Sequence, residues 1–121
     1  MKFVVKKEDL YNGIKIVERA TSAKALQPVL LNIYIETIGT SAIKLVATDL
    51  DLTVIAEVDA QVEEEGKITL PSKTLNEIVS KLGDKLITFE MTEGETSVNI
   101  TFQSLISLVF QLQNFLLNFL M

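Results

Sequence analysis

The stretch PSKTLNEIVSKLG, residues 71–83, decides the fold. Ser72 is a good N-cap and Gly83 is a good residue to follow a helix end, so the stretch predicts one helix with marked boundaries. Its apolar residues recur at helical spacing and form a single stripe made of Leu75, Ile78, Val79 and Leu82. Because only one face is apolar, we expect this helix to pack on a sheet.

Outward from this helix, apolar and polar residues alternate as they do in half-buried strands. The strands are expected at 2–6, 29–36, 43–47, 50–58 and 67–70 before the helix, and at 86–91 and 96–102 after it. A second helix is expected at about 8–20, because Leu10, Ile14 and Val17 recur at helical spacing. The order β-α-β-β-β-β-α-β-β, joined mostly by short turns, predicts an α+β domain with two helices packed on largely antiparallel sheet. The two halves share this order, which suggests an internal repeat.

Composition excludes several classes of function. The chain has 121 residues, enough for one domain. Its net charge is −5, which argues at first against a nucleic-acid binder, because phosphates attract Lys and Arg. It contains no Cys and no His, which removes thiolate chemistry and the commonest general base and zinc ligand. The first residues hold no secretory signal, so a cytoplasmic location is expected.

The densest polar cluster is TDLDL, residues 48–52. Asp49 and Asp51 would point the same way on a strand, which would suit a metal ion. No third ligand accompanies them, so we favour a turn that leads into the strand. An enzyme would require this pair to bind a metal; without it, the sequence predicts no catalytic residue, no metal site and no cofactor. The run EEE at 63–65 is interpreted as a solvated hairpin tip.

Four stretches together resemble one family, the bacterial sliding clamp, which is the beta subunit of DNA polymerase III. They are MKFVV (1–5), RATSAKALQPVLLNIYIE (19–36), LVATDLDLTV (45–54) and GKITLPSKTLNEIVSKL (66–82). The resemblance runs over residues 1–102 and implies the N-terminal domain of the DNA-clamp fold. It implies a non-catalytic processivity factor of DNA replication, although its family belongs to a polymerase holoenzyme.

In this family, three such domains in each of two chains close into a homodimeric ring around duplex DNA. Helices line the hole, and the ring tethers the polymerase by topology. An acidic ring with a few cations in its lumen is consistent with a net negative charge. Lys24 and Lys73 fall where the family carries basic DNA-contacting residues. Lys15 and Arg19 are further candidates because they share the polar helix face, although ordinary solvated helix surface would also explain these cations.

The resemblance also implies partners. In the family, polymerases and clamp loaders dock on domains that this chain does not contain. We therefore expect residues 1–102 to lack the peptide-binding cleft, and we expect this chain alone not to form the ring.

The resemblance stops near Phe102, and residues 103–121 form an apolar tail without charge, glycine or proline. A transmembrane helix would be too short and interrupted by Gln and Asn, and an amphipathic membrane helix would need basic residues. A native terminal helix is a third interpretation. The fourth is a frameshift, because the shifted codons of Gln103–Asn114 permit K-F-N-I-S-G-I-S-A-P-E-F, similar to the last strand of clamp domains. We expect this aberrant tail to be a frameshift; the alternative is a small membrane-associated or self-assembling protein with a clamp-like domain.

Overall fold

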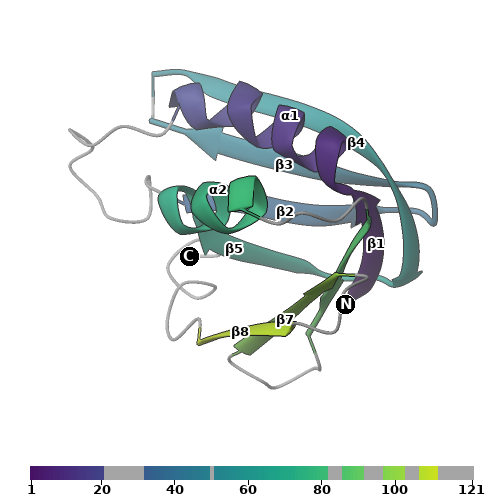
Figure 1. The fold of residues 1–121 in the computed structure, drawn as a ribbon. Coiled ribbons are helices and arrows are strands. Elements are labelled where there is room, and N and C mark those ends of the chain that lie inside the picture. Colours follow the sequence, from purple (N-terminus) through teal and green to yellow (C-terminus); the bar gives the residue numbers. More distant parts are fainter. Residues whose placement is uncertain (21–31, 50, 82–85, 92–96, 103–106, 112–121) are drawn as a thin grey trace.

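The computed structural model describes residues 1–20, 32–49, 51–81, 86–91, 97–102 and 107–111. Figure 1 shows their arrangement. In chain order the elements are β1 (Lys2–Lys6), α1 (Lys7–Val17), the 3₁₀ helix η1 (Glu18–Ala20), β2 (Asn32–Ile38), β3 (Ala42–Thr48), β4 (Thr53–Glu64), β5 (Lys67–Pro71), α2 (Ser72–Lys81), β6 (Leu86–Glu90), β7 (Ser97–Phe102) and β8 (Ser107–Gln111). The predicted α+β class and the order from β1 to β7 are confirmed. The structure adds β8 inside the segment predicted as a tail.

The described strands form one antiparallel sheet in the order β5-β2-β3-β4-β1-β6-β7-β8. Strand β4 is the longest and changes partner along its length. Its first part, Thr53 to Asp59, pairs with β3, and its last part, from Ala60 to Glu64, pairs with β1. This change joins the sheet of β5, β2 and β3 to that of β1, β6, β7 and β8. Each half of the chain runs strand, helix, then three strands, so the suggested repeat exists at the level of the elements.

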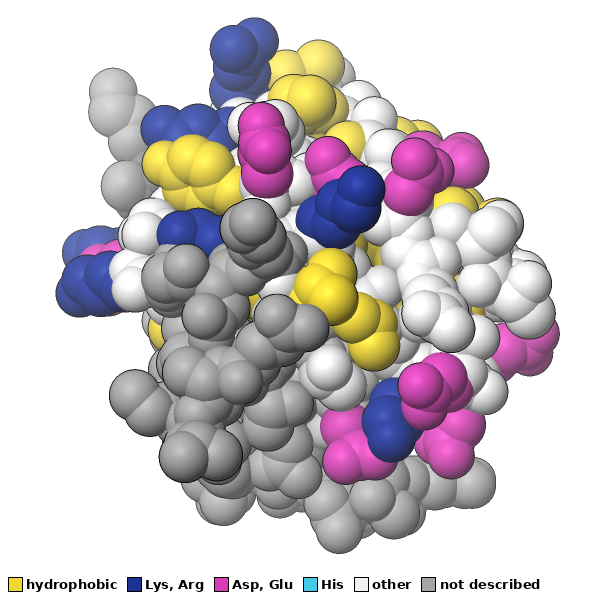
Figure 2. Space-filling model, turned by 45° about the vertical axis from the view of Figure 1, so that its right-hand side comes forward, with side chains coloured by type: hydrophobic (Ala, Val, Ile, Leu, Met, Phe, Trp, Pro, Cys, Tyr) yellow, Lys and Arg dark blue, Asp and Glu magenta, His cyan; other side chains and the backbone are white. Residues whose placement is uncertain are grey.

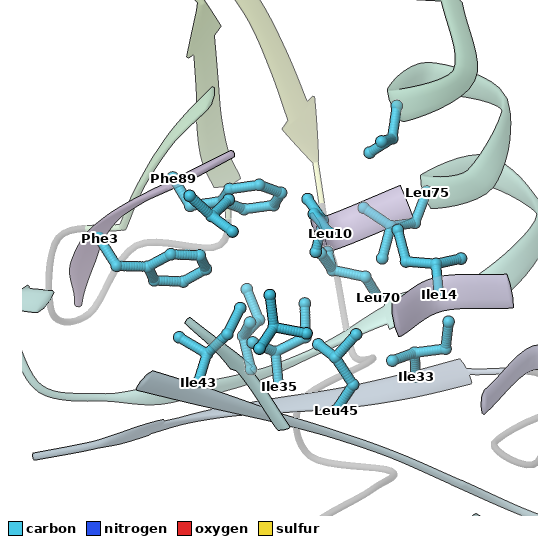
Figure 3. Close-up of a cluster of buried hydrophobic side chains, with 14 of the residues drawn as sticks. Phe3, Leu10, Ile14, Ile33, Ile35, Ile43, Leu45, Leu70, Leu75 and Phe89 are labelled. Carbon is cyan, nitrogen blue, oxygen red and sulfur yellow. The ribbon is translucent and has the colours of Figure 1, made fainter. Parts of the chain in front are cut away.

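Both helices lie on the same face of the curved sheet, and the core fills the space between them and the strands (Figure 1). Phe3 of β1 and Phe89 of β6 are register partners whose rings stack with centroids 5.0 Å apart. Figure 3 shows these rings beside aliphatic side chains from the helices and from the other strands. The largest of these buried side chains include Leu10, Ile14, Ile33, Ile35, Ile43, Leu45 and Leu75. The described residues of both predicted apolar stripes therefore face the sheet, and Leu82 lies outside the described residues.

The first helix is shorter than expected. Regular α-helix ends at Val17, and the next three residues form η1, so the predicted end near residue 20 holds only if this 3₁₀ turn is included. The backbone N–H of Glu18 donates to the carbonyl oxygen of Ile14, which closes the last α-helical turn. The change of helix type places Glu18 and Arg19 at the end of the helix rather than within it.

The first residue is part of the sheet hydrogen bonding. The Met1 ammonium donates to the carbonyl oxygen of Met91 at 3.0 Å, and the Met91 N–H donates back to the Met1 carbonyl oxygen at 2.9 Å. The Met1 side chain is buried in the core cluster. These bonds extend the β1–β6 pairing by one residue at each strand.

Candidate nucleic-acid interface

The two helices provide the surface on which most of the predicted site residues lie. They run side by side in opposite directions across one face of the sheet (Figure 1). Lys15 of α1, Arg19 of η1 and Lys73 of α2 are all exposed, as the polar faces of both helices predicted. Lys24 lies outside the described residues. The structure thus brings three of the four predicted cations to the helix side of the domain.

These three cations are not neutralised by neighbouring acids in the described part of the chain. The ion pairs found there involve Met1, Lys2 and Lys44, and none includes Lys15, Arg19 or Lys73. The ammonium of Lys15 instead lies 5.3 Å from the centroid of the Tyr11 ring, a cation–π distance that orients the side chain and leaves its charge intact. Exposed cations without an ion pair can attract phosphates.

On the other face of the sheet, Lys2 and Lys44 are matched by acids. Lys2 Nζ lies 3.3 Å from Glu63 and 3.6 Å from Glu90, and Lys44 Nζ lies 3.3 Å from Glu36. The hydrogen bond that the Lys2 ammonium donates to the Glu63 carboxylate is the main cause of a raised pKa for Lys2. Figure 2, turned by 45° from Figure 1 and so not a view of that opposite face, shows basic and acidic side chains interspersed over the side that it brings forward. The sheet side is therefore a poorer surface for a polyanion than the helix side.

A polar bond that the sequence did not reveal connects the two helices. The Asn76 side-chain amide of α2 donates to the Glu18 carboxylate of η1. Both residues are half-buried. Asn76 is not part of the apolar stripe of its helix, and nothing in the sequence spacing indicates a partner 58 residues away.

The structure favours the turn interpretation of the aspartate pair. Asp49 Oδ1 accepts hydrogen bonds from the backbone N–H groups of Asp51, at 3.0 Å, and Leu52, at 2.7 Å. The Asp49 N–H donates to the Leu52 carbonyl oxygen, which closes the turn. Strand β4 begins only at Thr53, so the expectation that it begins at residue 50 is wrong, because these bonds hold the preceding residues in the turn. Among the described residues, no cluster of three or more His, Cys, Asp or Glu side chains could hold a metal.

A membrane-spanning helix is one interpretation of the apolar tail. Within the described ranges, no helix has both the length and the apolar character needed to cross a bilayer.

Comparison with known proteins agrees with this geometry. The chain matches the family model of the DNA polymerase III beta subunit, N-terminal domain, over residues 1–115, which extends past Phe102. It is 40% identical over 89 residues to the beta sliding clamp of Synechocystis sp. and 36% identical over 102 residues to that of Synechococcus elongatus. These alignments cover 73% and 83% of this chain, but 23% and 27% of the relatives. The chain thus spans about a quarter of the length of these curated relatives.

Solved structures of sliding clamps share the fold of this chain. A DNA polymerase sliding clamp from Caulobacter crescentus has a TM-score of 0.80 and 28% identity, with 92% of this chain and 30% of that chain covered. A sliding clamp from Bartonella birtlesii has a TM-score of 0.82 and 28% identity, with 92% and 29% covered. The fold, the matched range and the identity to curated relatives together show that the chain belongs to the family of the DNA polymerase III beta subunit, in the region of its N-terminal domain.

Proposed function

We propose that this chain supplies one domain of a processivity clamp and that its helix side faces duplex DNA. The observation that carries the proposal is that cations on the helix side and on the sheet side differ in their ion pairing. The cations of the helix side, Lys15, Arg19 and Lys73, have no ion-pair partner in the described part of the chain, whereas Lys2 and Lys44 on the sheet side are paired. Lys24 joins the same site by its resemblance to family positions.

The proposed role is positional and not catalytic. A clamp tethers a polymerase by encircling DNA, and it slides because its few phosphate contacts are weak and carry no sequence information. The assembly that would do this is the homodimeric ring of the family, with the polymerase and the clamp loader as further partners, in the bacterial cytoplasm where the chromosome lies. One domain alone would not close that ring.

We also propose that residues 103–121 derive from a shifted reading frame, although the family match continues past residue 102 to residue 115. The support is the set of permitted codons, because the shifted reading of 103–114 resembles the last strand of a clamp domain. In the structure, β8 at Ser107–Gln111 pairs with β7 inside this segment. A shifted sequence can still extend a sheet here, because strand pairing uses backbone groups that every residue except proline provides. The nucleotide sequence after the Phe102 codon decides this point.

The DNA-facing role is tested by solution NMR. The ¹⁵N-labelled chain is titrated with a short duplex at about 20 mM salt, where screening is weak and millimolar binding is still visible. We expect amide shifts to concentrate on α1, η1 and α2, and Lys73→Gln to reduce the affinity. Lys67→Gln, which removes an exposed cation from β5, is the matched control and should have a smaller effect. Shifts on the strands instead, or no shifts at all, would overturn the proposal.

A further inference from the structure

Tyr11 contacts one of the cations of the proposed DNA-facing surface. Tyr11 and Lys15 belong to α1 and are four positions apart, so they are neighbours on the surface of the helix. A helical side chain leans towards the N-terminal end of its helix, which directs Lys15 back over Tyr11. The Lys15 ammonium accordingly lies 5.3 Å from the centroid of the Tyr11 ring, within the range of a cation–π contact.

The ring of Tyr11 has a fixed position because it packs against the core. The Tyr11 side chain is half-buried and lies against the buried core cluster, whereas that of Lys15 is exposed. A lysine side chain without a partner has several rotatable bonds and adopts many conformations in water. Contact with a fixed ring therefore restricts where the Lys15 ammonium can lie.

The chemistry of this contact differs from that of the paired lysines. Lys2 Nζ and Lys44 Nζ each lie 3.3 Å from a carboxylate, of Glu63 and Glu36 respectively, and a carboxylate cancels the charge that it holds. An aromatic ring has no net charge and attracts an ammonium through its quadrupole. The ammonium keeps its full positive charge, and its three N–H donors can still reach a partner on the side away from the ring.

We infer that Tyr11 is a positioning residue for DNA contact, which presents the Lys15 ammonium to a phosphate in a restricted set of conformations without neutralising it. This inference rests on the proposed function. Because the ring already restricts Lys15 before DNA arrives, less conformational freedom is lost when a phosphate binds. The gain is limited by the strength of an exposed cation–π contact, which corresponds to about two- to fivefold in an equilibrium constant.

A double-mutant cycle tests whether Tyr11 acts through Lys15. Tyr11→Leu removes the ring and keeps an apolar side chain against the core, Tyr11→Phe keeps the ring, and Lys15→Gln removes the cation. Duplex affinity is measured by NMR titration at about 20 mM salt for each variant and for the combination of Tyr11→Leu with Lys15→Gln. We expect Tyr11→Leu to weaken binding about two- to fivefold when Lys15 is present and to have no effect in the Lys15→Gln background. Tyr11→Phe should bind as the wild type does.

A second readout reports on the contact in the absence of DNA. The ring current of Tyr11 should shift the proton resonances of the Lys15 side-chain methylene groups upfield. Tyr11→Phe should keep this shift, and Tyr11→Leu should abolish it. The thermal midpoint of Tyr11→Leu should change little, because leucine is a good helix former and keeps the apolar contact with the core.

The failure of this inference can be distinguished from the failure of the proposed function. Equal weakening by Tyr11→Leu in both backgrounds would show that Tyr11 contacts DNA itself or acts through stability, and the inference would fall. It would also fall if Tyr11→Leu bound as tightly as the wild type or left the Lys15 resonances unshifted, while the DNA-facing surface would stand. If Lys15→Gln and Lys73→Gln both leave the affinity unchanged, the surface itself is wrong and the proposed function fails with the inference.

Discussion

Gly13 of α1 lies against Val58 of β4 so closely that a Cβ on Gly13 would stand 2.7 Å from Val58 Cγ2 and 3.0 Å from Leu45 Cδ1. Glycine in a helix interior costs about 0.5–1 kcal/mol relative to alanine, yet here it lets the helix approach the sheet. We predict that Gly13→Ala destabilises the domain, because overpacking of about 1–3 kcal/mol exceeds the gain in helix propensity. Urea unfolding measures the change.

The control for this prediction is Asn12→Ala, an exposed position on the same helix where alanine should be neutral or favourable. In the Val58→Ala background, the penalty of Gly13→Ala should shrink, since the contact atom is gone. A stabilised Gly13→Ala protein would show that α1 lies farther from β4 than described.

The two faces of α2 predict opposite responses to an aspartate. Val79 is fully buried against the core, so Val79→Asp should cost several kcal/mol or prevent folding, because it buries an unpaired charge. Lys73 is exposed, so Lys73→Asp should change the free energy of unfolding by less than about 1 kcal/mol. Circular dichroism during urea unfolding compares them. Equal losses of stability would mean that the helix is rotated about its axis.

The raised pKa of Tyr34 leads us to predict that the domain loses stability at alkaline pH. Burial, and then a hydrogen bond donated by its hydroxyl to Glu36 at 3.0 Å, raise the pKa of Tyr34 from 10.0 to about 12. The folded state therefore favours the protonated phenol, and this stabilisation is complete below pH 10 and is lost as the pH rises towards 12. The stability of Tyr34→Phe should fall less steeply over this window than that of the wild type. Parallel pH profiles would contradict the assignment.

DNA affinity should be very low for this chain alone at physiological salt. The described helix side offers Lys15, Arg19 and Lys73, whereas non-specific dissociation constants of about 10⁻⁴–10⁻⁶ M belong to proteins with more phosphate contacts. Fluorescence anisotropy with a labelled duplex at about 150 mM salt should show no saturation at micromolar protein. Micromolar binding that Lys73→Ala leaves unchanged would place the interaction elsewhere.

The tail should determine how the protein behaves in solution. Strand β8 lies at the end of the described sheet order, and the sequence beside it has none of the charges or prolines that block edge-to-edge pairing. We predict that the chain as given self-associates, whereas a version carrying K-F-N-I-S-G-I-S-A-P-E-F-P after Phe102 elutes as a monomer. Size-exclusion chromatography of both, expressed in parallel, makes the comparison. A monomeric native-tail protein with no improvement in the other would end the frameshift hypothesis.

Local patterns in the sequence were sufficient for most elements. The spacing of Leu10, Ile14 and Val17 predicted a buried face, and all three are fully buried. The start of β4 was placed too early, since apolar alternation continues through Leu52 and only the hydrogen bonds of Asp49 end it. β8, Ser107–Gln111, was not predicted, because the segment after Phe102 was interpreted as the product of a shifted reading frame.

Only part of the candidate site could be predicted from the sequence, because spacing carries only local information. Exposure of Lys15 and Lys73 follows from the period of each helix, which is local information. The Glu18–Asn76 bond and the fit of Gly13 against Val58 depend on how separate elements meet in space. Such contacts leave no spacing signal in one sequence.

β1, the earliest described strand in the sequence, is an interior strand of the described sheet, and this sets an order on folding during synthesis. β1 lies between β4 and β6, and Met1 bonds to Met91, so Met1 is synthesised 90 positions before its hydrogen-bond partner. The meander β2–β3–β4 needs only neighbouring residues and can form earlier, as contacts between near neighbours do. Until residues 86–91 emerge, one edge of β1 and the ring of Phe3 lack their partners. A nascent chain halted before that point would present this apolar strand to chaperones and to other chains.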